Sequence, residues 1–105
     1  MSLIANTPNP PYYAVIFSNL QSEDLEGYSQ TAARMVELAA QQPGFLGIEA
    51  AREELGITVS YWKDLDSIRH WKREAEHLQA QKSGRERWYT AYKTRIALVE
   101  RDYDK

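Results

Sequence analysis

Two hydrophobic periodicities alternate along this 105-residue chain, and their order is the strongest constraint on its fold. Apolar residues at alternate positions are typical of half-buried strands, whereas apolar residues three or four positions apart are typical of amphipathic helices. Strand-like patterns cover four segments: Tyr12 to Leu20, Phe45 to Arg52, Ile57 to Trp62 and Trp88 to Arg101. Helix-like patterns follow the first of these segments and precede the last. The sequence therefore predicts the order βαββαβ.

Particular residues predict where the two helices begin and end. Ser22 is placed to cap the first helix, and Pro43 with Gly44 ends it. Asp64 is placed to cap the second helix, which runs until Gly84. Each helix then has one apolar stripe that can lie against a sheet.

The order βαββαβ is that of the ferredoxin-like fold of the α+β class, a four-stranded antiparallel sheet with both helices on one face. The hairpin-length link Glu53 to Gly56 joins the second and third strands, so these two should pair antiparallel. At this length we expect one domain over residues 12–105, preceded by a flexible, proline-rich arm of residues 1–11.

Apolar side chains occur on both faces of the first and last predicted strands. Alternation places Tyr13, Val15, Phe17 and Asn19 together on the face that the helices cover. The opposite face, which carries Ile16, then needs another cover. We expect a second copy of the chain to supply it, so the predicted assembly is a homodimer.

Charge and composition narrow the range of partners. A net charge of −2 gives no basic surface for phosphate backbones or anionic membranes, so we expect neither nucleic acid nor membrane as a partner. The absence of cysteine excludes disulfides and thiolate metal sites. No apolar run is long enough to span a membrane, and the N-terminus lacks the pattern of a secretory signal. These features predict a cytoplasmic protein.

The stretch from Thr58 to Tyr103 holds all three tryptophans, both histidines and four of the seven tyrosines. Such a concentration favours a pocket for a small apolar or aromatic molecule, with Trp62, Trp71 and Tyr92 among its walls. The simpler interpretation is that aromatic residues at the ends of elements only fill the core.

A polar stripe on the second predicted helix has the spacing of metal ligands. Its members are His70, Glu74, His77 and Gln81. A carboxylate-bridged metal site needs a second such motif on another helix, and the first predicted helix has no histidine. We therefore interpret the stripe as a solvated face and expect no metal.

Several features of the chain resemble the antibiotic biosynthesis monooxygenase (ABM) family of dimeric α+β barrel proteins. They are the PGF sequence at residues 43–45, the aromatic pair Tyr61 and Trp62 at the end of the third strand, and Trp71 followed by His77 on the second helix. The resemblance extends from Tyr12 to Tyr103. The same fold hosts cofactor-free oxygenases of aromatic polyketides, haem-degrading enzymes and proteins with no assigned reaction.

The resemblance implies a cofactor-independent monooxygenase that acts on an electron-rich aromatic such as a phenol, a quinol or a polyketide. The substrate's own anion would react with O2, so the protein need only deprotonate it, desolvate it and stabilise the developing oxyanion. His77 would be the base and Asn19 the oxyanion donor, unless His77 only lies at the surface and Asn19 only caps the turn toward Ser22. Phe17 would join the aromatic walls.

Two other functions remain open at this point. The first is a non-catalytic dimer that binds a small apolar metabolite or acts as a stress-related module, which needs only the pocket. The second is haem binding or degradation. In that branch of the fold the position of the iron-ligating histidine falls on Gln81 here, and glutamine is a poor haem ligand.

Overall fold

The computed structural model describes residues 3–82 and 84–105, with side chains throughout these ranges except at residues 80–85. Its elements, in chain order, are β1 (Tyr12–Gln21), α1 (Tyr28–Ala40), β2 (Phe45–Arg52), β3 (Gly56–Trp62), α2 (Leu65–Lys82), α3 (Gly84–Trp88) and β4 (Tyr89–Val99). The four strands form one sheet in the order β2-β3-β1-β4, and every neighbouring pair is antiparallel. The predicted ferredoxin-like α+β fold is thus confirmed.

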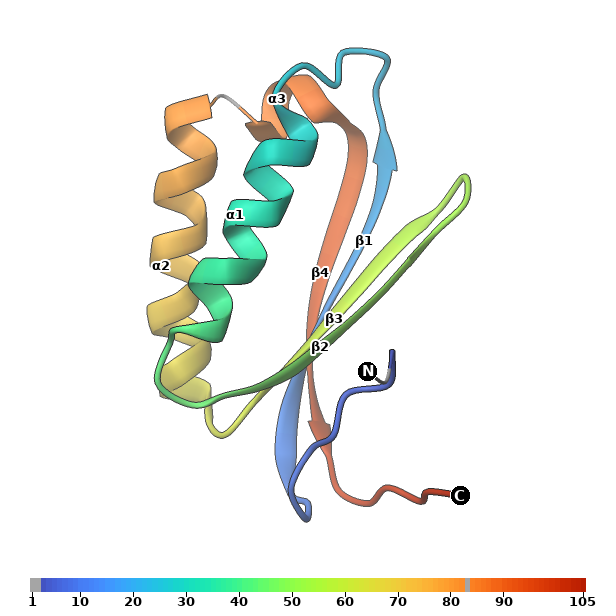
Figure 1. Ribbon diagram of the computed structural model, residues 1–105, viewed down its shortest axis with the longest axis vertical. Helices are drawn as coiled ribbons and strands as arrows, with labels where there is room; N and C mark the ends of the chain where they lie inside the picture. The colour runs from blue at the N-terminus through green and yellow to red at the C-terminus, as the bar shows by residue number, and fades with distance from the viewer. Residues whose placement is uncertain (1–2, 83) are drawn as a thin grey trace.

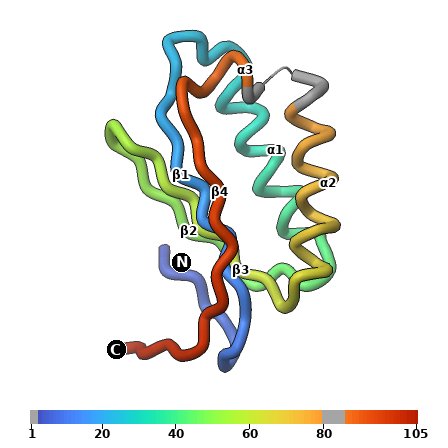
Figure 2. The backbone as a smooth tube through the Cα atoms, turned by 180° about the vertical axis from the view of Figure 1, so that it is seen from behind, coloured from blue at the N-terminus to red at the C-terminus, as the bar shows by residue number. Residues whose placement is uncertain are grey.

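Helices α1 and α2 lie side by side on one face of this sheet, as Figures 1 and 2 show from opposite sides. Val15 and Tyr13 of β1 point to this helix-covered face and pack against the core. On the other face, which we call the open face, Tyr12 and Ala14 are buried. The alternation predicted for the first strand is therefore confirmed, because successive side chains point to opposite faces.

The hydrophobic core is centred on Trp62, whose side chain is 0% exposed. Its indole stacks on that of Trp71, with ring centroids 5.9 Å apart and an angle of 23° between the planes. The indole Nε1 donates to Ser60 Oγ at 2.8 Å, so the polar atom of this buried ring has a partner. Ile68 and Ala39 complete the buried cluster and bring α2 and α1 onto β3.

The first helix begins later than predicted. Ser22 does not cap it; the Ser22 hydroxyl donates to the carbonyl of Arg87, and its backbone N–H donates to the carbonyl of Trp88 at 2.7 Å. Gly27, in a left-handed conformation with φ of 79°, precedes the first helical residue, Tyr28. Hydrogen bonds to a distant segment thus draw the residues after β1 away from the helix.

The second helix begins as predicted. The backbone N–H of Ser67 donates to Asp64 Oδ1 at 2.8 Å, which is a side-chain cap at the start of α2. Hydrogen bonds from the Ser67 side chain and backbone hold the pKa of Asp64 below its usual range. The helix ends at Lys82, and the short helix α3 follows where the sequence predicted a simple stop at Gly84. Strand β4 accordingly begins at Tyr89 rather than Trp88.

The N-terminal arm and the C-terminal tail both lie on the open-face side of the sheet (Figures 1 and 2). The N–H of Ala5 donates to Glu49 Oε2 at 2.9 Å, and the Tyr12 hydroxyl donates to Asp102 Oδ2 at 2.7 Å. Within the described part of the chain, no helix is both long and apolar enough to cross a membrane.

Candidate functional site

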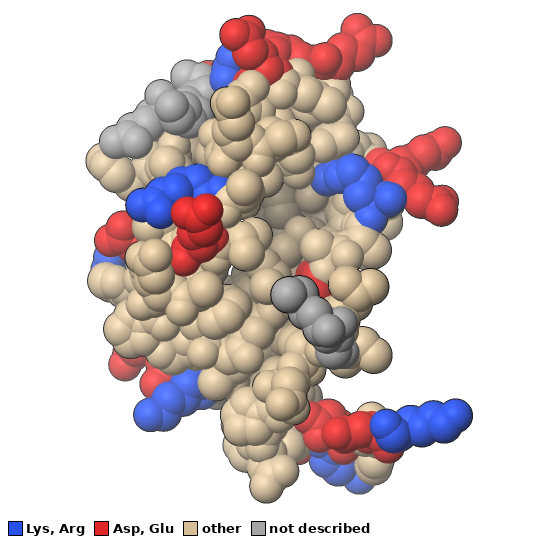
Figure 3. Space-filling view, viewed as in Figure 1, with Lys and Arg blue, Asp and Glu red and all other residues tan. Residues whose placement is uncertain are grey.

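A cavity of about 710 Å³ lies between the sheet and the two long helices. Its floor is the helix-covered face of the sheet, including Val15 of β1, Ile48 of β2 and Thr58 of β3, and its roof is formed by α1 and α2. Figure 3 shows a hollow between the helix layer and the sheet, with charged side chains on both sides of it. The volume is in the range that small-molecule sites commonly have.

Four of the predicted site residues line this cavity: Phe17, Asn19, Trp71 and Tyr92. They come from β1, α2 and β4, so only the fold brings them together. Phe17 and Tyr92 are in ring contact, with centroids 5.8 Å apart. Tyr92 is 44% exposed, which places it where the cavity opens to solvent.

Trp62 does not line the cavity, which differs from its predicted place in the wall. It lies behind Trp71 and is fully buried, so it has no surface to offer a ligand. Tyr61, which also belongs to the aromatic-rich stretch, points to the open face, where its hydroxyl donates to Glu49 Oε1 at 2.6 Å. The difference arises because adjacent residues of β3 point to opposite faces.

His77 is exposed on α2 and is not among the side chains that line the cavity. It follows Ala75, which lines the cavity, by two residues, and two residues rotate a helix by roughly 200°. His70 and Glu74 are exposed as well. Among the described residues no group of three or more histidine, aspartate or glutamate side chains gathers as metal ligands. Gln81, the position considered for haem, lies outside the described side chains.

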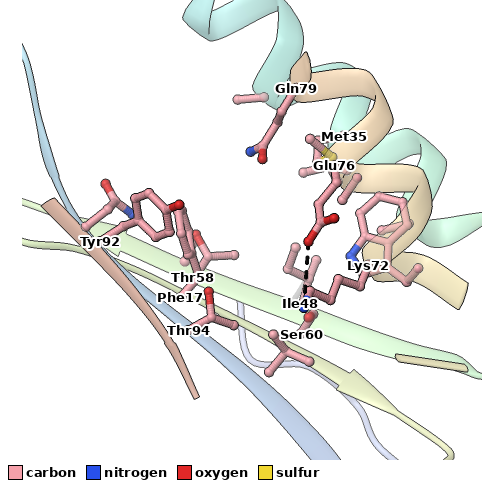
Figure 4. A pocket seen from close by; sticks show the side chains of 18 of the residues that line it. Phe17, Met35, Ile48, Thr58, Ser60, Lys72, Glu76, Gln79, Tyr92 and Thr94 are labelled. Carbon is pink, nitrogen blue, oxygen red and sulfur yellow. Dashed lines mark ion pairs between the residues drawn. The ribbon is translucent and has the colours of Figure 1, made fainter. Parts of the chain in front are cut away.

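An ion pair on α2 supplies charge to the cavity, and sequence reasoning missed it. Lys72 Nζ and Glu76 Oε1 are 3.7 Å apart, and both side chains line the cavity together with Gln79. Figure 4 shows Glu76 and Lys72 extending from α2 toward the sheet, opposite Tyr92 and Phe17. Helical spacing could have revealed them, because Lys72 lies three residues before Ala75 and Glu76 lies four residues after Lys72.

The most buried polar side chain in the cavity wall is that of Asn19, which is 3% exposed. Its Oδ1 accepts a hydrogen bond from Arg52 Nη2 on β2. It therefore does not cap the turn toward Ser22 through this oxygen. Thr31 of α1 is also buried and lines the cavity, so a few polar groups face a space that is otherwise apolar and aromatic.

An antiparallel βαββαβ domain belongs to the ferredoxin-like class of α+β proteins, and this one has a cavity between its two layers. Residues 11–83 match the antibiotic biosynthesis monooxygenase (ABM) family, and the chain belongs to this family. This membership supports a monooxygenase-type function.

Three proteins illustrate what the chain is similar to. It is 54% identical over 103 residues to the uncharacterized protein YqjZ of Bacillus subtilis (strain 168), an alignment that covers 96% of this chain and 90% of YqjZ. A solved structure of a variant of SnoaB, a cofactor-independent oxygenase from Streptomyces nogalater, superposes with a TM-score of 0.74 at 15% identity and covers 91% of this chain and 100% of that one.

The third is the protein SO0527 from Shewanella oneidensis, with a TM-score of 0.72 at 10% identity over 94% of this chain and 100% of that one. At these identities the two structures show the shared fold alone.

Proposed function

We propose that this protein is a cofactor-independent monooxygenase that acts on an electron-rich aromatic substrate, such as a phenol or quinol, bound in the cavity between the sheet and the helices. The observation that carries the proposal is an aromatic-lined cavity of about 710 Å³ with the buried amide of Asn19 in its wall. A flat, apolar ring fits such walls, and the hydroxyl that ionises needs a polar partner inside.

The proposed chemistry uses the substrate as the source of electrons. Once its hydroxyl is deprotonated, the ring carbon of the anion bonds to O2 and the hydroperoxide that forms loses water. One oxygen atom then remains on the ring as a carbonyl, and the other leaves with the two hydrogens that the substrate gives up. The protein's part is to take the proton, exclude water and stabilise the anion.

Each lining side chain has a role in this proposal. Asn19 donates to the oxyanion, and Trp71, Phe17 and Tyr92 form the aromatic walls. Trp62 contributes indirectly, because it stacks on Trp71 from behind and fixes its orientation. These roles follow from where the side chains lie in the cavity.

Two neighbouring residues of α2, Glu76 and His77, are the candidates for the base. Histidine is the residue type best suited to exchange protons near neutral pH, but the His77 side chain is on the exposed side of the helix. Glu76 lines the cavity and is paired with Lys72, so it has the access that a base requires. If Glu76 is the base, Glu76→Gln lowers kcat at least 100-fold and His77→Ala retains most of the activity; the reverse pattern assigns His77.

The proposal is tested by aerobic and anaerobic turnover of a panel of quinols with metal-free protein. We expect product formation that requires O2, exceeds autoxidation and falls at least tenfold in Asn19→Ala. Consumption no faster than autoxidation across the panel would rule the activity out. A thermal shift with the same compounds but no product by mass spectrometry would instead support a non-catalytic binding protein.

We further propose that the domain works as a homodimer. Apolar side chains at the open face, such as Leu20 and Ile57, are 43% and 38% exposed, and the helices cannot reach that face. A second copy packed there removes them from water and protects the edges of the sheet.

A further inference from the structure

Three residues on three adjacent strands form a bridge that ends at the cavity. Asn19 of β1 pairs with Gly56 of β3, and Gly56 pairs with Arg52 of β2, so the three lie in one row across the sheet. The Arg52 side chain crosses over Gly56, and its Nη2 donates to Asn19 Oδ1.

Only glycine at position 56 leaves room for this crossing. A Cβ atom built on Gly56 would overlap the Nη2, Cζ and Nη1 atoms of Arg52. Gly56 itself is buried, and the guanidinium lies where its side chain would be. Because Gly56 of β3 has no side chain, Arg52 on the edge strand β2 can reach the amide of Asn19 on β1, two strands away.

The bridge fixes which end of the Asn19 amide is used. Since the Oδ1 atom accepts from a cationic donor, the Nδ2 group, which can only donate, is the end left for a ligand. Hydrogen bonds to charged donors are about twice as strong as neutral ones, and a hydrogen bond at the oxygen polarises the amide so that its N–H groups donate more strongly. Among the described side chains Arg52 has no ion pair with a carboxylate, so its charge is not neutralised there.

We propose that Arg52 is a positioning residue that holds and polarises the Asn19 amide as a donor for the oxyanion of an ionised phenol or enol in the cavity. This inference rests on the proposed function, in which Asn19 is the oxyanion donor that Arg52 orients. Arg52 does not itself line the cavity and acts only through Asn19.

The first test needs no ligand and reads the Asn19 side-chain amide by NMR. In the wild-type protein the charged hydrogen bond should slow rotation about the Cγ–Nδ2 bond, because electron density drawn to Oδ1 strengthens the partial double bond. The rotation rate should rise about tenfold in Arg52→Met and in Gly56→Ala, which pushes the guanidinium away while leaving arginine in the chain, and Arg52→Lys should recover part of the effect. Arg69→Met, which removes an exposed arginine of α2, is the matched control. An unchanged rate in Arg52→Met would overturn the positioning role.

The second test measures the pKa of bound 4-nitrophenol from the absorbance of its phenolate. Wild-type protein should lower this pKa, and Arg52→Met and Asn19→Ala should each raise it by about one unit, a tenfold loss of anion stabilisation. If the lowering of the 4-nitrophenol pKa is lost in Asn19→Ala but kept in Arg52→Met, the inference about Arg52 is wrong and the proposed function still stands. If 4-nitrophenol and the quinols of the panel do not bind to wild-type protein, the proposed function fails, while the amide rotation rate still decides whether Arg52 positions Asn19.

Discussion

At the scale of single residues, the two faces of the sheet divide the aromatic side chains into two sets. Phe17 and Tyr92 face the cavity, whereas Tyr12 and Tyr61 face the open side, where their rings meet edge to face at 5.7 Å. The second set is bound to carboxylates: the Tyr61 hydroxyl donates to Glu49. One set is thus available to a ligand and the other is engaged in holding the sheet, the arm and the tail together.

Stability at alkaline pH should depend on Tyr61. Burial and the hydrogen bond to Glu49 raise the pKa of Tyr61 above its ordinary value of 10.0. The folded protein therefore holds a proton that the unfolded chain releases, so this contribution is complete below about pH 10 and is lost as the pH rises above it. Above this pH, the unfolding free energy measured with urea should fall less steeply with pH in Tyr61→Phe than in the wild-type protein. The two slopes should differ by at most about 1.4 kcal/mol per pH unit.

If the wild-type protein and Tyr61→Phe decline with equal slopes above pH 10, the phenol does not carry this dependence. Tyr103→Phe is a suitable control, since that side chain is exposed.

Strand alternation predicted the cavity residues of β1 correctly, because the pattern repeats every two residues and needs no knowledge of neighbours. It failed to place Trp62, whose burial depends on how closely Trp71 packs over it. Side-chain chemistry alone favours His77 as a base, although the helical period already puts it away from Trp71 and Ala75. The contact between Arg52 and Asn19 had no sequence signal, because it depends on the strand order β2-β3-β1.

At the scale of elements, the short helix α3 organises the entry into α1. The indole Nε1 of Trp88 donates to the carbonyl of Glu26 at 2.9 Å, and the Trp88 ring meets that of Tyr28 edge to face at 5.6 Å. Ser22 bonds to the carbonyls of Arg87 and Trp88 from the other end of the same loop. These contacts hold residues 22–27 outside the helix, which no local propensity could indicate.

Replacing Trp88 with phenylalanine should loosen this loop without emptying the core. A six-membered ring remains, but the hydrogen bond to the Glu26 carbonyl is lost and the smaller side chain leaves a void at a buried site, at a combined cost of about 1–3 kcal/mol. We expect a corresponding fall in the urea midpoint and faster proteolysis within residues 22–27. Equal proteolysis rates in the two proteins would show that the indole does not hold the loop.

At the scale of the whole molecule, the arm and the tail cover one part of the open face and leave another part uncovered. Ala5 lies against β2, close to Gly47, and the Tyr12 hydroxyl joins Thr7 to Asp102. Strand β4 is mostly exposed along its length, and on the open face Leu20 of β1 and Ile57 of β3 are 43% and 38% exposed.

Removal of residues 1–10 should leave the domain folded but less stable. The sheet and helices keep their own hydrogen bonds, while the Ala5 bond to Glu49 and the Thr7 bond to Tyr12 are lost. We expect an unchanged circular dichroism spectrum and a melting temperature lower by a few degrees. Loss of cooperative melting would contradict this and make the arm an integral part of the fold.

The assembly prediction concerns Ile16, whose side chain lies on the open face between Val59 of β3 and Arg95 of β4. In the proposed dimer, Ile16→Asp places a carboxylate from each subunit between two sheets beside its cross-strand neighbour Arg95, and taking these charges out of water costs several kcal/mol, more than their pairing returns. We expect multi-angle light scattering to show the wild-type protein as a dimer and the variant as a monomer, partly unfolded or aggregated. Leu65→Asp adds the same charge to an exposed apolar site on α2 and should remain dimeric. A well-folded Ile16→Asp dimer at micromolar concentration would mean that the two copies meet through another surface, because a dimer that buries position 16 could not accommodate the two charges.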